Sequence, residues 1–439
     1  MVLEKIKLAL TLEPGSRPIF KGLAAVFTGK VLATGMGFIA TIIAARVLGP
    51  HDYGLFSVFM AVLVIAVFFL GKNLDTGLVK FYGYYSGNNP DLARASIRVA
   101  FNLRIVAGIG GVVTGYLLSN SIAIFLFHNP DLVFPLKMAF LGAFGMSLWY
   151  FSLTIFQARE EFLKYSVLEA VFNLLRAICI FGLLLVGKLT LANAILAVTA
   201  VIYLNMVLGF VSLPRGVLGG RPSDKKIGWN LVGFCKWIFL AEVICILYYK
   251  QDILILNYFR EPDSVGLYSA AFTALVLVEY LTSALVVVQL PAASRLSCFD
   301  EYKGYIRRSL IISSMLSVII IPMFFFAEPL MITFFSDSYN QSVRIFRILF
   351  FGFAIRIFTH PLYLLFMSID RPKILAAIFG SVLVLNLCGN FLFVPIYGEI
   401  GAAWVTLTSR IVEGALICLS VYSFVFLKNA QVLHGIKIS

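Results

Sequence analysis

Five of the basic residues that lie inside long apolar stretches of the sequence, where a charge is costly, lack a local acidic partner. They are Lys30, Arg104, Lys236, Lys250 and Arg356, and none has an acidic residue three or four positions away. An ionisable group in the middle of a bilayer costs ~2.5–3.5 kcal/mol on insertion scales, so each needs a compensating environment. Lys and Arg supply the counter-charge that a phosphate or pyrophosphate group needs in order to cross hydrocarbon. We therefore predict that these five residues bind an anionic headgroup in a water-filled cavity.

Two of these lysines are spaced to act one after the other along a single helix. Lys236 and Lys250 are 14 residues apart, which is nearly four helical turns, so they share one face at depths ~21 Å apart. Such a ladder would pass an anionic headgroup from one leaflet toward the other. The alternative is that the two ammonium groups reach the lipid headgroups on opposite sides.

Three of the carboxylates that fall within apolar stretches are candidates for a coupling site. They are Glu242, Asp252 and Glu279. Intramembrane carboxylates are common relay groups in transporters, because a proton or a sodium ion can neutralise them. Glu279, near the middle of its stretch, is the first choice. The alternative is that Glu279 only compensates Lys30 or Lys236 across a cavity.

Other features of the sequence argue for pairing and against chemistry of other kinds. Arg410 with Glu413, and Lys72 with Asp75, are each spaced i,i+3 and are predicted to form local ion pairs. None of the six cysteines forms a CxxC pair, so neither a metal site nor a disulfide framework is indicated. Glycine-rich phosphate loops, HExxH and GxSxG are absent. We expect no catalytic residues, no enzymatic activity and no cofactor apart from a coupling Na⁺ or H⁺.

The elements that must position these residues are membrane-spanning helices. The chain of 439 residues is 60% apolar and only 13% charged, with a mean hydropathy of +0.94. These values predict an all-α polytopic membrane protein with about twelve helices and no sizeable soluble domain. The predicted spans are 22–47, 54–80, 97–119, 132–157, 165–187, 190–213, 229–257, 264–291, 306–335, 341–368, 374–394 and 400–427.

The distribution of basic residues predicts the orientation. Lys and Arg gather at both termini and in the connections that follow even-numbered spans, whereas only Arg46, Lys188, Arg260 and Arg344 lie in or close beside the other connections. By the positive-inside rule, both termini are cytoplasmic, in the cytoplasmic membrane. The net charge of +13 then reflects orientation and contact with lipid headgroups, and we expect membrane lipids but no nucleic acid as partners.

An internal repeat divides the chain into two halves. The residues from Gly49 to Ser57 match those from Glu261 to Ser269, with Gly54 over Gly266 at an offset of 212. Each half holds an even number of spans, so both insert with the same polarity around an axis along the membrane normal. The predicted organisation is an interfacial segment (1–21), an N-terminal six-helix bundle (22–213), a cytoplasmic linker (214–228), a C-terminal six-helix bundle (229–427) and a cytoplasmic tail (428–439).

Three short motifs carry a resemblance to a known family. The stretch Ala44-Ala45-Arg46-Val47-Leu48-Gly49-Pro50-His51-Asp52-Tyr53-Gly54 resembles the AR-x-LG-x-x-x-YG signature of Wzx-like polysaccharide flippases, in the multidrug/oligosaccharidyl-lipid/polysaccharide (MOP) exporter superfamily. Agreement continues at Phe156–Phe162 and at Gly266–Tyr268. The resemblance implies transbilayer movement of a polyprenyl (pyro)phosphate-linked glycan, with glycan biosynthesis enzymes as candidate partners. Multidrug or small-molecule export and lipid II flipping, both found in the same superfamily, are the alternatives.

Overall fold

The computed structural model of the chain describes residues 17–87, 89–219, 225–293, 296, 299–368 and 372–423. The predicted interfacial segment up to residue 16, residues 220–224 of the predicted linker and the predicted tail lie outside the described residues. The described residues form helices and no strands, which confirms the all-α prediction. The helices are α2 (Arg17–Val67), α3 (Leu74–Ser86), α4 (Pro90–Ser121), α5 (Val133–Ala158), α6 (Phe162–Leu185), α7 (Leu191–Val211), α8 (Lys225–Phe259), α9 (Pro262–Ala293), α10 (Phe299–Phe325), α11 (Ala327–Phe335), α12 (Ser342–Ser368) and α13 (Pro372–Val421).

Ten helical segments of the described chain are long and apolar enough to cross a membrane. Two of them, Gly35–Ser86 and Lys373–Val421, have 52 and 49 residues. A straight helix of 52 residues would measure roughly 78 Å, more than twice the ~30 Å hydrocarbon core. Both segments are interrupted by a glycine with positive φ, Gly49 at 73° and Gly398 at 59°. These breaks fall where the sequence predicts that one span ends and the next begins. The count of twelve stays a prediction.

The second predicted span is not continuous, contrary to expectation. The helix α2 passes into a wide five-residue turn, Phe68–Lys72, before α3 begins. Inside that turn Gly71 has φ 106°, a conformation that favours glycine. We predicted one helix over 54–80 because the stretch is apolar, and hydropathy does not report on backbone bonding. Side chains of the first site described below donate to the carbonyl groups at this break.

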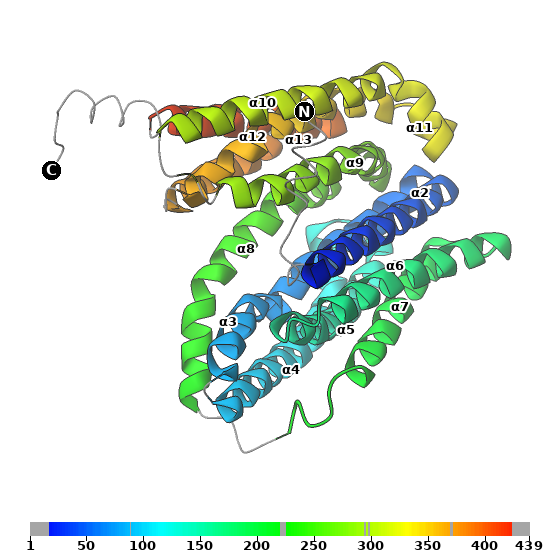
Figure 1. Ribbon diagram of the computed structural model, residues 1–439. Coiled ribbons are helices and arrows are strands. Elements are labelled where there is room, and N and C mark those ends of the chain that lie inside the picture. Colours follow the sequence, from blue (N-terminus) through cyan, green and yellow to red (C-terminus); the bar gives the residue numbers. More distant parts are fainter. Residues whose placement is uncertain are drawn as a thin grey trace. The chain divides into compact units, whose positions relative to one another are not determined.

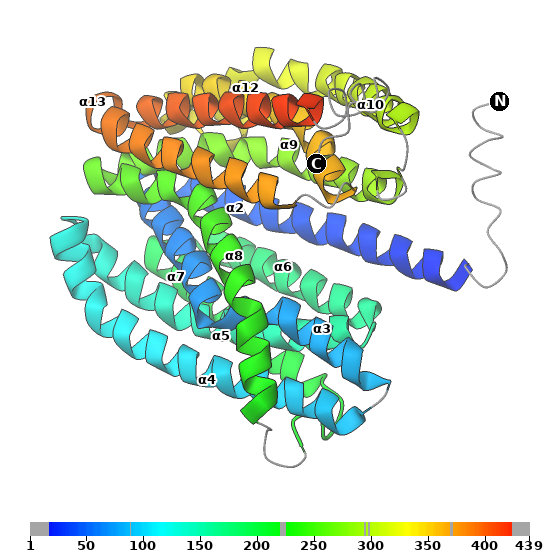
Figure 2. The same cartoon turned by 90° about the vertical axis from the view of Figure 1, so that its left-hand side faces the viewer.

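The chain divides into two compact units, each with its own core. One comprises the described residues up to Ala44, with Ala66–Ser119 and Leu136–Phe239. The other comprises Ala45–Ile65, Asn120–Pro135 and the described residues from Leu240 onward. In the second unit α9, α10, α12 and α13 lie side by side in both views (Figure 1, Figure 2).

Glycines allow the close helix packing inside these units. A Cβ at Gly108 of α4 would overlap the ring of Phe144 of α5, and one at Gly115 would overlap the ring of Phe140. Small residues at helix interfaces are the usual way in which membrane helices approach closely, because lipid supplies no hydrophobic drive for association.

The two motifs of the repeat contact one another reciprocally within the second unit. A Cβ at Gly54 would overlap the carbonyl oxygen of Pro262, and one at Gly266 would overlap the carbonyl oxygen of Pro50. The offset of 212 residues relates Gly54 to Gly266 and also Pro50 to Pro262. A two-fold relation between the matched turns predicts this reciprocity.

Candidate functional site

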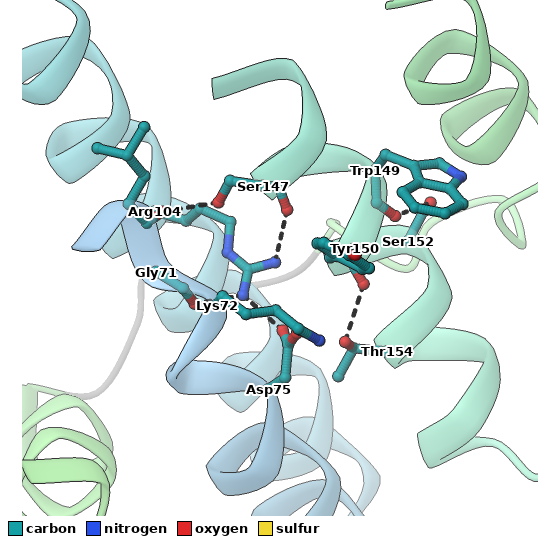
Figure 3. Close-up of polar contacts among 10 residues, drawn as sticks. Gly71, Lys72, Asp75, Arg104, Ser147, Trp149, Tyr150, Ser152 and Thr154 are labelled. Carbon is teal, nitrogen blue, oxygen red and sulfur yellow. Dashed lines mark hydrogen bonds and ion pairs between the residues drawn. The ribbon is translucent and has the colours of Figure 1, made fainter. Parts of the chain in front are cut away.

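The first charged site, in the first unit, is built around the break after α2. The Arg104 side chain of α4 is fully buried and donates from Nη2 to the carbonyl oxygen of Gly71 at 2.5 Å. The Ser147 hydroxyl of α5 donates to the carbonyl oxygen of Leu70 at 2.7 Å. Figure 3 shows the guanidinium between the broken segment and α5. Side chains of α4 and α5 thus donate to two carbonyl groups at the break, which helps to satisfy backbone acceptors in a membrane interior.

Two acid–base contacts complete this site. Arg104 Nη2 lies 2.5 Å from Asp75 Oδ1, and Lys72 Nζ lies 2.7 Å from Asp75 Oδ2. The Lys72 ammonium also lies 4.2 Å from the centre of the Tyr150 ring. The predicted pair of Lys72 and Asp75 is confirmed. We expected no acidic partner for Arg104 within its own helix, and its partner comes from α3.

The second charged site, in the second unit, is centred on Arg356 of α12. Its Nη1 lies 2.8 Å from both carboxylate oxygens of Glu279 of α9. Its Nη2 donates to the Tyr249 hydroxyl of α8 at 2.7 Å and lies 3.2 Å from His360 Nε2. The Arg356 Nε and the His360 Nδ1 are buried and have no hydrogen-bond partner among the described residues. The structure therefore brings together two residues that the sequence assigned to different roles.

A second ion pair lies beside this one. Arg410 Nη1 and Glu413 Oε2 of α13 are 2.9 Å apart, and both side chains are buried. Tyr248 donates to the same carboxylate oxygen at 3.0 Å. The Arg410 guanidinium carbon lies 4.8 Å from the centre of the Tyr248 ring and 5.6 Å from that of Tyr249. The predicted pair is confirmed, and the two tyrosines connect it to Arg356.

The third site surrounds Asp252 of α8 and differs in kind. Its carboxylate accepts hydrogen bonds from the Tyr268 hydroxyl (2.7 Å), the Asn390 amide (2.7 Å) and the Thr406 hydroxyl (2.8 Å). Asp252 is buried, and within the described chain it has no cationic partner. A buried carboxylate with only neutral donors is expected to hold a proton or a small cation.

The polar network around Asp252 has spare acceptors. Gln251 donates to Asn386, which donates to the Ser409 hydroxyl at 3.0 Å and accepts a bond from Asn390 at 2.9 Å. The Gln251 Oε1 and Asn390 Oδ1 atoms are buried, and within the part of the chain that the structure describes neither has a donor. Amide and carboxylate oxygens in excess of donors favour a cation at this place.

The remaining predicted residues are more scattered. Lys236 is exposed, with its ammonium 5.5 Å from the Trp237 ring centre. Lys250 is half-buried and forms no hydrogen bond or ion pair with any described residue. Glu242 is half-buried and interacts with other groups of the protein. The Lys30 side chain lies outside the described part of the structure, although its backbone belongs to α2.

Sequence reasoning missed several participants of these sites. Asn386 and Asn390 are spaced i,i+4 in an otherwise apolar stretch, which is a signal that could have been used, because polar side chains are rare in spans and face the bundle interior. His360 and Thr406 carry no such signal on their own. Their roles follow from contacts between helices far apart in the chain.

Comparison with known proteins finds a family match and relatives that are named for glycan transport. The family described as "Polysaccharide biosynthesis protein" matches residues 43–344. A Shigella flexneri protein named as an O-antigen transporter is 22% identical over 401 residues, covering 88% of this chain and 92% of the relative. A Haloferax volcanii protein named as a low-salt glycan biosynthesis flippase is 25% identical over 426 residues, covering 92% of this chain and 83% of the relative.

Solved structures show the same fold. An inward-closed lipid II flippase MurJ superposes with a TM-score of 0.74 at 15% identity, covering 96% of this chain and 94% of that one. An inward-facing multidrug transporter of the MATE family, in the MOP superfamily, gives a TM-score of 0.73 at 13% identity, covering 89% and 95%.

Proposed function

The chain belongs to the polysaccharide biosynthesis protein family, and from that premise we propose that it is a flippase for a lipid-linked oligosaccharide or polysaccharide precursor. The observation that carries the proposal is that this family match covers most of a multi-pass helical chain. Two relatives named for glycan transport support it. The likeness to multidrug exporters and to MurJ concerns the fold alone, at 13% and 15% identity. We assign the chain no catalytic step.

The substrate that we propose is a glycan on a polyprenyl phosphate or pyrophosphate, and Arg356 is the residue best placed to bind its anion. The guanidinium is held by Glu279, Tyr249 and His360, and its Nε still lacks a partner among described residues. A substrate phosphate would displace the Glu279 carboxylate, because Arg binds phosphate with the same fork that it offers to a carboxylate. Glycan biosynthesis enzymes are the protein partners that this role implies.

For coupling, the geometry supports Asp252 over Glu279. The Glu279 charge is already neutralised by Arg356, whereas Asp252 is surrounded by neutral donors and spare amide oxygens. Binding of a sodium ion or a proton at Asp252 would neutralise it and bias the equilibrium between conformations. Asp252→Asn should abolish the response of transport to an imposed ion gradient in liposomes. Glu279→Gln, the matched control, removes the carboxylate that competes with the phosphate for Arg356, so it should not weaken substrate binding and should keep the gradient response.

The reverse pattern would contradict this assignment. If Glu279→Gln removes the gradient response and Asp252→Asn retains it, coupling resides at Arg356 and Glu279.

We further propose that the protein lies in the cytoplasmic membrane with both termini in the cytoplasm, as the distribution of Lys and Arg predicts. A fusion at Ser439 to a reporter that is active only outside the cytoplasm should stay silent. A signal from that fusion would show the opposite orientation.

The substrate class can be tested by binding to the purified protein. A lipid-linked oligosaccharide should raise the midpoint temperature of thermal unfolding, because a ligand stabilises the native state that binds it. Lipid II or a cationic dye at equal concentration should raise it less. Greater stabilisation by the dye would favour multidrug export, and greater stabilisation by lipid II would favour a peptidoglycan precursor.

A further inference from the structure

One face of α10 forms a shallow, widely open groove of about 750 Å³ that the sites above do not use. Its lining comes entirely from this helix and includes Lys303 and Arg307 at one end and Leu310, Ile311, Met315 and Val318 beyond them. The opposite face of α10 is buried. There the Ser313 hydroxyl donates to the Ile357 carbonyl oxygen of α12 at 2.7 Å, so the groove lies on the outer face.

The charged end of the groove suits a phosphate. Lys303 and Arg307 are exposed and one turn apart, and neither forms an ion pair with any residue that the structure describes. Asp300 and Glu301 lie earlier, in the first turn of the helix. Two unpaired cations on adjacent turns match the double charge of a phosphate monoester or a pyrophosphate better than the single charge of a phospholipid diester.

The apolar end suits a single chain. No charged residue occurs between Leu310 and Phe325, and Leu310, Ile311, Met315 and Val318 are exposed. The track from Arg307 to Val318 is ~16 Å long and one helix face wide. One isoprenoid chain fits such a track, whereas the two acyl chains of a phospholipid would diverge from it.

We propose that this groove binds the polyprenyl phosphate part of the lipid-linked substrate. The phosphate lies between Lys303 and Arg307, and the first isoprene units lie along Leu310, Met315 and Val318. The choice of occupant rests on the proposed flippase function. The groove would hold the carrier at the membrane face while its headgroup enters the protein.

Binding of undecaprenyl phosphate to the full chain in detergent, measured by native mass spectrometry, tests this proposal. Arg307→Ala should weaken binding about tenfold, because a charge-assisted contact is lost. The matched control is Arg308→Ala, which removes the same side chain from the next, exposed position outside the groove; it should change binding by less than about twofold. Equal losses in the two variants, or no loss in either, would overturn the proposal.

A second pair of variants tests the track and the source of the phosphate. Met315→Trp should fill the groove and reduce binding, whereas Ile319→Trp, at an exposed position outside it, should not. Phosphatidylglycerol and uncharged undecaprenol should each compete poorly. Full competition by phosphatidylglycerol would make the groove an unselective lipid surface and reject the assignment. These experiments measure binding and not transport, so a failure to bind undecaprenyl phosphate at the groove leaves the flippase proposal intact. Conversely, a protein that binds undecaprenyl phosphate normally but does not flip a lipid-linked oligosaccharide would refute the flippase proposal alone.

Discussion

The buried charges at the break after α2 lead to a specific prediction about Asp75. Arg104 is fully buried, and Asp75 is its acidic partner, at 2.5 Å. Asp75→Leu would leave that buried guanidinium without an anionic partner, bonded only to the carbonyl oxygens of Gly71 and Ser147. Removing one partner of a buried pair costs ~3–5 kcal/mol, because the remaining charge keeps its desolvation penalty. We expect this variant to be among the least stable single substitutions in the first unit.

The magnitude can be checked against the opposite substitution. Arg104→Met removes the donor to the carbonyl oxygens of Gly71 and Ser147, and a hydrogen bond to a charged group contributes about 1.5–3 kcal/mol. It leaves Asp75 paired with Lys72, so no buried charge is orphaned. The double variant Asp75→Leu/Arg104→Met should therefore be at most about 1 kcal/mol less stable than Arg104→Met alone. That would be a strongly non-additive result.

Thermal unfolding of the purified variants in one detergent measures this cycle. Lys72→Met is the matched control, because it removes the other, partly exposed cation bound to Asp75. It should lower the midpoint far less than Asp75→Leu does. If the effects of the single substitutions simply add in the double variant, the two charges do not depend on each other and the reasoning is refuted.

Three further predictions concern other contacts. Gly54→Ala should destabilise the protein by ~1–3 kcal/mol or more, since its Cβ would overlap backbone atoms of Pro262. The control Gly380→Ala, at a position with open space around it, should be neutral or stabilising in the same unfolding assay. Equal losses of stability in the two variants would contradict this account. Glu413→Gln should lower the unfolding midpoint strongly, because Arg410 is buried beside it; an unchanged midpoint would mean that Arg410 finds another anion. Hydrogen bonds from Lys164 and Arg159 lower the pKa of Glu161, which lies outside the spans, from 4.5. The stability that the ionised carboxylate contributes is therefore present above about pH 4.5 and is lost as the pH falls through the lowered pKa. A Glu161→Gln variant should be less stable than wild type at neutral pH and equally stable in acid.

The sequence was sufficient for the fold class and for local pairing. Hydropathy located the breaks at Gly49 and Gly398, because a span ends where glycine, proline and charge interrupt the apolar pattern. The two i,i+3 pairs were predictable, because helical geometry alone brings such residues together.

The long-range partners were not predictable from one sequence. Arg104 meets Asp75 and Arg356 meets Glu279 only because separate helices pack together, and a periodicity carries no information about which helices do so. The helix break at Gly71 was not predicted, for a related reason. The side chains of Ser147 and Arg104 satisfy its carbonyl groups from other helices, so the local sequence still reads as an apolar span.

Transbilayer movement of a fluorescent lipid-linked oligosaccharide in proteoliposomes tests the central claim most directly. A membrane-impermeant reductant bleaches only outer-leaflet label, so empty liposomes should lose about half of the signal. With the protein present we predict nearly complete bleaching, and the recovered lipid should be chemically unchanged. A plateau equal to that of empty liposomes, from protein that is folded and inserted, would contradict the flippase assignment.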